Sequence, residues 1–168
     1  MGGLVLKILF TLTALSPALF VYGIMKLANS MNTTGIAFCF LSLIGIFAHW
    51  VTLKWTLRKL PNIKLSIIEI TPSDNKLISY TITYFIPIME GTILSTKLLT
   101  IVFCLLFVVI IFSYASWYNP LHFLFGYHYY DIKDSHSINK TIISKQKLNN
   151  TKVPLQVREL GPYQYIKS

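Results

Sequence analysis

Long uncharged apolar runs dominate the first three quarters of the chain. Residues 8–25, 27–53 and 98–130 contain no Asp, Glu, Lys or Arg. A helix needs about 20 apolar residues to cross a bilayer core of roughly 30 Å. The pattern therefore predicts transmembrane helices at about residues 8–28, 35–54 and 98–117.

A fourth crossing is predicted for residues 77–96, which contain Pro87 and Glu90. The charge-free part is short, so hydropathy leaves open a short crossing or a re-entrant arm. Charge favours a crossing, because most Lys and Arg lie in residues 54–76 and after residue 117, and the positive-inside rule puts both regions in the cytoplasm. We therefore expect a multi-pass membrane protein with both termini cytoplasmic, since three crossings would export the basic tail.

The polar segments read as strands. IKLSIIEIT, HYYDIK, INKTIISKQKL and PLQVRELGPYQYI are β-branched and aromatic runs bounded by turn residues. A lone hairpin is marginal in water, so we expect one small sheet. The predicted fold is an α-helical integral membrane protein with four transmembrane helices, the third short and Pro-containing, plus a small cytoplasmic β-rich region. Its parts are a first transmembrane hairpin (1–53), a cytoplasmic loop with a strand (54–76), a second transmembrane hairpin (77–117), and an interfacial segment with a β-rich tail (118–168).

Composition agrees with a membrane protein. Hydrophobic residues make up 54% and charged residues 12%, about half the charged share of soluble domains. The formal charge of +9 fits basic cytoplasmic segments, so we expect no direct contact with nucleic acid. Cys39 and Cys104 fall inside apolar runs and imply no disulfide framework.

No catalytic motif is present, and we expect a protein that is not an enzyme and has no cofactor. His122, His128 and His136 lack a Cys or carboxylate at ligand spacing, so they do not predict a metal site. A membrane-embedded enzyme ranks third, behind a membrane sensor or scaffold and a small channel or transporter.

One polar stripe lies in the fourth predicted crossing. On a helix, Ser79, Thr83, Pro87 and Glu90 share one face. An acid within a crossing is a functional candidate, although Glu90 at the outer mouth would simply meet water. If the chain oligomerises around this stripe, the acids form a ring that favours cations. A small oligomeric ion channel or transporter is therefore the alternative function.

A seam of small and polar residues marks the second predicted crossing. Gly35, Cys39, Ser42, Gly45 and His49 recur at helical spacing and allow another helix to approach closely. We expect this seam to pack helices within one subunit or between subunits. His49 provides either a polar contact between helices or an interfacial side chain.

The tail offers a docking surface for a partner protein. A sheet edge can add a strand from a partner, and a basic face can attract an acidic one. The same lysines could instead hold the sheet against anionic lipid, which is also an expected partner. The candidate docking residues are Tyr129, Tyr130, Ile143, Lys145, Lys147 and Arg158.

Several segments between residues 65 and 166 resemble the KwaA family, the membrane subunits of the bacterial Kiwa anti-phage defence system. They are ITPSDNKLISYTITYFIPIM, NPLHFLFGYHYYDI, TIISKQKL and VRELGPYQYI, in this order. The resemblance implies a four-span homo-oligomer of the bacterial inner membrane, such as a tetramer, that senses infection and recruits or activates a cytoplasmic effector, KwaB. His128 stands where a basic Arg or Lys is expected for the family, so a role for that side chain is not carried over.

Overall fold

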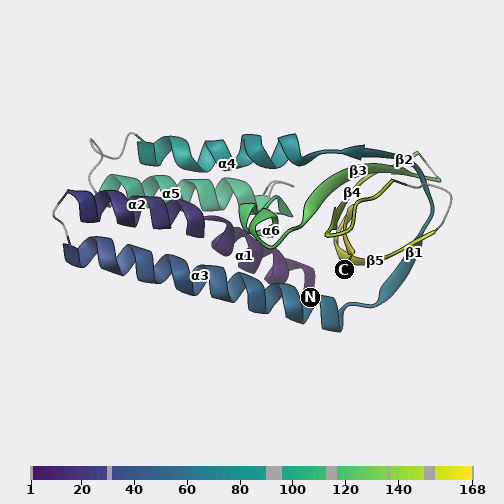
Figure 1. Ribbon diagram of the computed structural model, residues 1–168, viewed down its shortest axis with the longest axis horizontal. Coiled ribbons are helices and arrows are strands. Elements are labelled where there is room, and N and C mark those ends of the chain that lie inside the picture. Colours follow the sequence, from purple (N-terminus) through teal and green to yellow (C-terminus); the bar gives the residue numbers. More distant parts are fainter. Residues whose placement is uncertain are drawn as a thin grey trace.

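The computed structural model describes residues 2–29, 32–89, 96–112, 117–135, 137–149 and 154–167. Long helices gather at one end of an elongated molecule, and a curled sheet forms the other end (Figure 1). Both ends of the chain lie near the boundary between the two parts (Figure 1). Segments that are far apart in sequence therefore meet where the helices join the sheet.

The helices follow the apolar runs of the sequence. Pro17 interrupts the first run, because a proline within a helix removes a backbone hydrogen bond but is tolerated in the first turn. The first run accordingly divides at Leu15 into two helices. The helices are α1 (Gly2–Ala14), α2 (Ser16–Ala28), α3 (Asn32–Lys59), α4 (Asp74–Met89), α5 (Thr96–Phe112) and α6 (Pro120–Leu124).

Small residues bring α2 and α3 into backbone contact. A Cβ added at Gly23 would lie 2.9 Å from the backbone nitrogen of Cys39, and one added at Gly35 would lie 2.8 Å from that of Leu27. Real Cβ atoms do not approach other atoms this closely. The two glycines thus permit a separation of the helices that side chains would prevent.

The strands form one curled sheet in the order β1-β5-β6-β4-β3-β2. β4 and β6 pair in parallel, and the other neighbours are antiparallel. β1 and β2 are separated only by Ser66, yet they occupy opposite ends of this order. The sheet therefore curls until its two edges meet along one stretch of chain. The strands are β1 (Asn62–Leu65), β2 (Ile67–Pro72), β3 (His128–Asp134), β4 (Asn139–Ser144), β5 (Leu155–Gly161) and β6 (Gln164–Lys167).

Both faces of the sheet are covered. Side chains alternate between faces along a strand. One face encloses the interior of the curl, with Tyr130 and Ile142 in its core. The other face packs against the helices, and its core contains Tyr129, Ile143 and, from α1, Phe10. Neighbouring residues of β3 and β4 are consequently buried in two different cores.

The predicted fold of four transmembrane helices with a small β-rich region is wrong. The fold is mixed, with a six-stranded sheet, and among the described residues two stretches, Leu4–Ala28 and Thr33–Lys59, are long and apolar enough to cross a membrane. α4 does not qualify because it has 16 residues and begins with the polar run Asp74-Asn75-Lys76. The apolar part of α5, Thr100–Phe112, is shorter than the roughly 20 residues that a crossing needs.

Candidate functional site

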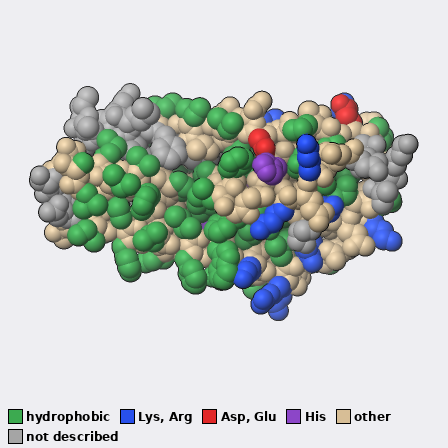
Figure 2. All heavy atoms as spheres, viewed as in Figure 1, with side chains coloured by type: hydrophobic (Ala, Val, Ile, Leu, Met, Phe, Trp, Pro, Cys, Tyr) green, Lys and Arg blue, Asp and Glu red, His purple; other side chains and the backbone are tan. Residues whose placement is uncertain are grey.

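Apolar side chains gather over the helical end of the molecule (Figure 2). Only 22% of an apolar 18-residue segment within Thr33–Lys59 is buried, so most of this segment of α3 lies on the outside of the molecule. Phe40 and Phe47 are each 64% exposed on its outer face. Soluble proteins rarely expose large apolar surfaces, and where they occur they mark contact with a membrane or a protein.

Basic side chains gather over the sheet end (Figure 2). Ion pairs between described residues join Lys76 to Asp131, Lys133 to Glu69 and Lys140 to Asp134, each at 2.6 Å, and the His128 ring forms a hydrogen bond with Asp74 at 2.9 Å. Lys145 and Lys147 are exposed and belong to none of these pairs. The Lys145 Nζ lies 4.9 Å from the centre of the Tyr127 ring. These two lysines thus give the sheet end a positive charge that the three lysine–carboxylate ion pairs do not neutralise.

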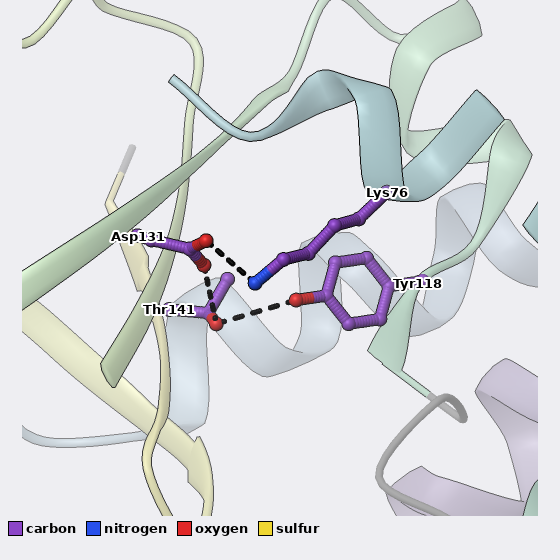
Figure 3. A network of polar contacts seen from close by, with 4 residues as sticks. All are labelled: Lys76, Tyr118, Asp131 and Thr141. Carbon is purple, nitrogen blue, oxygen red and sulfur yellow. Dashed lines mark hydrogen bonds and ion pairs between the residues drawn. The ribbon is translucent and has the colours of Figure 1, made fainter. Parts of the chain in front are cut away.

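A polar network ties α4 to the sheet (Figure 3). Lys76 reaches from α4 to Asp131 of β3, and Thr141 of β4 lies between Asp131 and Tyr118, 3.3 Å and 3.5 Å from their oxygens. The hydrogen bond to Asp131 raises the pKa of Lys76, and burial raises the pKa of Tyr118. Lys76 therefore stays charged and Tyr118 stays neutral at physiological pH. An adjoining hollow of about 480 Å³ is lined by Lys76, Asp131, Asn139, Lys140, Thr141, Tyr163 and Gln164.

Asn119 joins three segments at the boundary between helices and sheet. Its side-chain nitrogen donates to the backbone oxygen of Phe10 at 2.9 Å and to the Thr13 hydroxyl at 3.0 Å. Its side-chain oxygen accepts from the backbone N–H of Leu121 at 2.9 Å and caps α6. The Asn119 backbone N–H donates to the Tyr129 hydroxyl of β3 at 3.0 Å. One fully buried residue thus fixes α1, α6 and β3 relative to one another.

Two buried histidines complete this boundary. The His122 Nδ1 lies 2.6 Å from the Tyr129 hydroxyl, and the His49 Nδ1 lies 3.0 Å from that of Thr13. The two rings are 4.8 Å apart, and among the described residues neither Nε2 has a hydrogen-bond partner. Burial lowers the pKa of His122 well below its usual range, so this ring is neutral at pH 7.

The buried His122 predicts that stability falls with acidification. The unfolded chain binds a proton at His122 below about pH 6.5 whereas the folded chain does not, so folding loses up to about 1.4 kcal/mol per pH unit. Thermal unfolding in mild detergent between pH 7.5 and 5 measures this slope. His122→Gln is expected to make this slope shallower without abolishing it, because His49 remains fully buried. His128→Gln, which replaces a partly exposed ring, serves as the control. An unchanged slope in His122→Gln would contradict the prediction.

The residues predicted for docking divide into two groups. Tyr129, Tyr130 and Ile143 are buried in the two cores, so their side chains have no free surface for a partner. Lys145 and Lys147 are exposed. The remaining one, Arg158, is half-buried, and its Nε donates to the Leu60 backbone oxygen at 3.2 Å.

The predicted packing seam lies along α3 and faces α1 and α2. Cys39 and Gly35 lie at the close approach to α2, and the Ser42 hydroxyl donates to the Ser16 backbone oxygen at 2.7 Å. A Cβ added at Gly45 would collide with the Ser16 hydroxyl. His49 continues the seam to Thr13 of α1. These contacts are all within one chain.

The predicted stripe is described only in part. Ser79 is exposed on α4, and its hydroxyl donates to the Asn75 backbone oxygen at 3.1 Å. Glu90 and the side chains of Thr83 and Pro87 lie outside the described residues. Within the described part of the chain, no group of three or more His, Cys, Asp or Glu side chains is placed to hold a metal.

Sequence reasoning missed Asn119 and Asp74. Both carry a recognisable signal, because Asn before Pro is a typical helix N-cap and first-turn pair, and Asp74 lies in the first turn of α4. Their partners, Phe10, Thr13 and Tyr129, are distant in sequence, so no local pattern indicates the contacts.

The comparisons with known proteins identify a family. A family model described as "Anti-phage protein KwaA" matches residues 6–166, nearly the whole chain. No curated protein matches the sequence, and no solved structure matches the fold.

Proposed function

The chain belongs to the KwaA family of anti-phage proteins, and on this premise we propose that it is a non-enzymatic membrane sensor and scaffold that recruits a cytoplasmic effector on infection. Anti-phage defence follows from the family. The sensor and scaffold role, the membrane location and the effector, of the KwaB type that the resemblance implied, form the proposal.

The helices support a membrane location. Leu4–Ala28 and Thr33–Lys59 are each long enough to cross a bilayer, and they pack against each other as an antiparallel pair (Figure 1). The outer surface of α3 is apolar, as lipid contact requires. We propose that these two stretches insert as a hairpin.

The charge distribution supports a cytoplasmic sheet. Lys54, Arg58 and Lys59 lie near the end of α3 that leads into β1, and Lys7 lies in α1 at the same end of the hairpin. Basic residues beside a crossing favour the cytoplasmic side. The sheet and both chain ends would then face the cytoplasm, where an effector is accessible.

The separation of an exposed apolar helical end from a basic sheet end carries the proposal (Figure 2). One end suits lipid and the other suits an acidic protein surface. The fully buried junction of Asn119, His49 and His122 joins them, so that a change among the helices reaches the sheet without crossing a flexible linker.

Recovery of the effector from membranes of phage-infected cells tests the proposal. The full-length chain is extracted in mild detergent and captured, and co-purifying soluble protein is quantified. Lys145→Glu with Lys147→Glu is expected to lower effector recovery at least tenfold, because two attractive contacts become repulsive. Lys97→Glu, an exposed charge change on α5, serves as the control.

Either of two results would contradict the proposal. Wild-type protein that leaves the membrane in a carbonate wash would exclude the inserted hairpin. Equal effector recovery by the wild type and the double lysine variant would exclude these lysines as the docking surface.

A further inference from the structure

An apolar groove runs between α4 and α6. It has a volume of about 480 Å³, within the roughly 300–1,000 Å³ typical of small-molecule sites. Ile78 and Ile82 line one wall and Phe123 and Leu124 the other, and all four side chains are more than half exposed. The groove therefore offers an apolar ligand a surface that the protein itself leaves uncovered.

A second hollow of about 330 Å³ has the opposite character. Lys145, Lys147 and His128 line it, together with Asn149. Lys145 and Lys147 belong to none of the ion pairs between described residues. The hollow is therefore suited to an anionic group.

The groove and the hollow meet at Asp74, which lines both. The rings of Phe123, in the groove, and His128, in the hollow, are in edge contact at 5.5 Å between centres. The Asp74 carboxylate is turned toward protein donors, because it accepts from the Tyr129 backbone N–H at 2.8 Å and lies 2.9 Å from the His128 Nδ1. The apolar groove and the basic hollow are therefore adjacent and share Asp74 as part of their walls.

We propose that this composite recess binds one anionic glycerophospholipid, with an acyl chain in the groove between α4 and α6 and the headgroup against Lys145 and Lys147. A soluble phosphate compound would leave the apolar groove empty, and a neutral lipid would leave the two lysines unmatched. The inference rests on the proposed function, since it requires the helical end to lie in a bilayer, and the lipid headgroup and the effector would compete for Lys145 and Lys147.

Native mass spectrometry of the full-length chain in mild detergent tests this site. The probes are phosphatidylglycerol and phosphatidylcholine with identical acyl chains. We expect retention of one phosphatidylglycerol per chain with about tenfold preference over phosphatidylcholine, equivalent to about 1.4 kcal/mol. Ile82→Trp, which fills the groove, should abolish retention of both lipids. Lys145→Gln with Lys147→Gln should remove the preference but keep acyl binding.

Control variants distinguish lipid binding at this site from nonspecific lipid binding elsewhere on the protein. Ile101→Trp adds the same ring to an exposed position of α5, and Lys133→Gln removes a charge from β3; both should retain phosphatidylglycerol. Ile82→Gln removes apolar lining without adding bulk, so it tests the groove even if the tryptophan variant fails to fold.

Several outcomes would overturn the proposal. They are equal retention of the two lipids by the wild type, unchanged retention in Ile82→Gln and Ile82→Trp, and displacement of phosphatidylglycerol by millimolar inorganic phosphate. Binding of an amphipathic peptide in place of lipid would also overturn it. A chain that recovers the effector but retains no phosphatidylglycerol would refute the lipid site and leave the proposed function standing.

Discussion

Replacing Gly35 with leucine is expected to separate α2 from α3 and to lower the thermal midpoint by about 6–12 °C, equivalent to about 3 kcal/mol. Even a single added Cβ would lie 2.8 Å from the backbone nitrogen of Leu27 and 2.9 Å from the backbone oxygen of Gly23. Backbone atoms cannot rotate away, so the helices themselves must move. Circular dichroism of the detergent-solubilised protein during heating measures the effect.

The smaller change Gly35→Ala provides a sharper test of the same contact. In an open helix this substitution stabilises by about 1 kcal/mol, because glycine is the poorer helix former. At the α2–α3 contact we expect the opposite sign. The control is Ala37→Leu, which introduces the same leucine side chain as Gly35→Leu but at an exposed position of α3; it should leave the thermal midpoint nearly unchanged. A stabilised Gly35→Ala protein would mean that the helices do not touch at this glycine.

Replacing Asn119 with alanine is expected to cost about 2–4 kcal/mol and to loosen the boundary between helices and sheet. The change removes the cap of α6, worth about 1 kcal/mol, leaves the Leu121 N–H without its partner, and removes both buried amide hydrogen bonds to Phe10 and Thr13 of α1. Denaturation of the detergent-solubilised protein gives the loss of stability, and amide hydrogen exchange in α1, α6 and β3 shows where the structure loosens.

Serine at position 119 divides this loss into its two parts. A serine oxygen can still cap α6, but it cannot replace both amide hydrogen bonds to α1. We expect Asn119→Ser to recover about 1 kcal/mol of the loss and to leave α1 exchanging faster. Asn149→Ala, at an exposed asparagine, should change neither quantity. A loss of less than 1 kcal/mol in Asn119→Ala would show that the junction does not depend on this side chain.

The secondary structure was largely predictable because it depends on local patterns. The four strand-like runs cover β1 to β6 to within one residue at the end of a strand, and the first two apolar runs cover most of α1, α2 and α3. The membrane prediction failed at α4 and α5. The positive-inside rule favoured a membrane crossing at residues 77–96. In the structure the helix there starts at Asp74, and an ion pair between Lys76 and Asp131 ties its polar first turn to the sheet.

The candidate residues differ in how well their surroundings could be predicted. Gly35, Ser42 and Gly45 follow a helical period, and such a period marks one face of a helix whatever lies against it. Tyr129, Tyr130 and Ile143 are docking candidates from the sequence because a sheet edge can add a strand from a partner. In the structure β3 and β4 lie inside the sheet rather than at an edge, and both faces of the sheet are covered, so these side chains are buried.

The sequence by itself determined which segments are apolar helices, which are strands and where positive charge accumulates, because helical period, strand alternation and charge are properties of neighbouring residues. Only the tertiary structure decided that Asn119 joins α1 to β3, that His49 meets His122, and that a groove beside α4 opens onto two lysines. These contacts join residues that are distant in the chain, and they exist only because the sheet curls closed at Ser66 and packs its outer face on the helices.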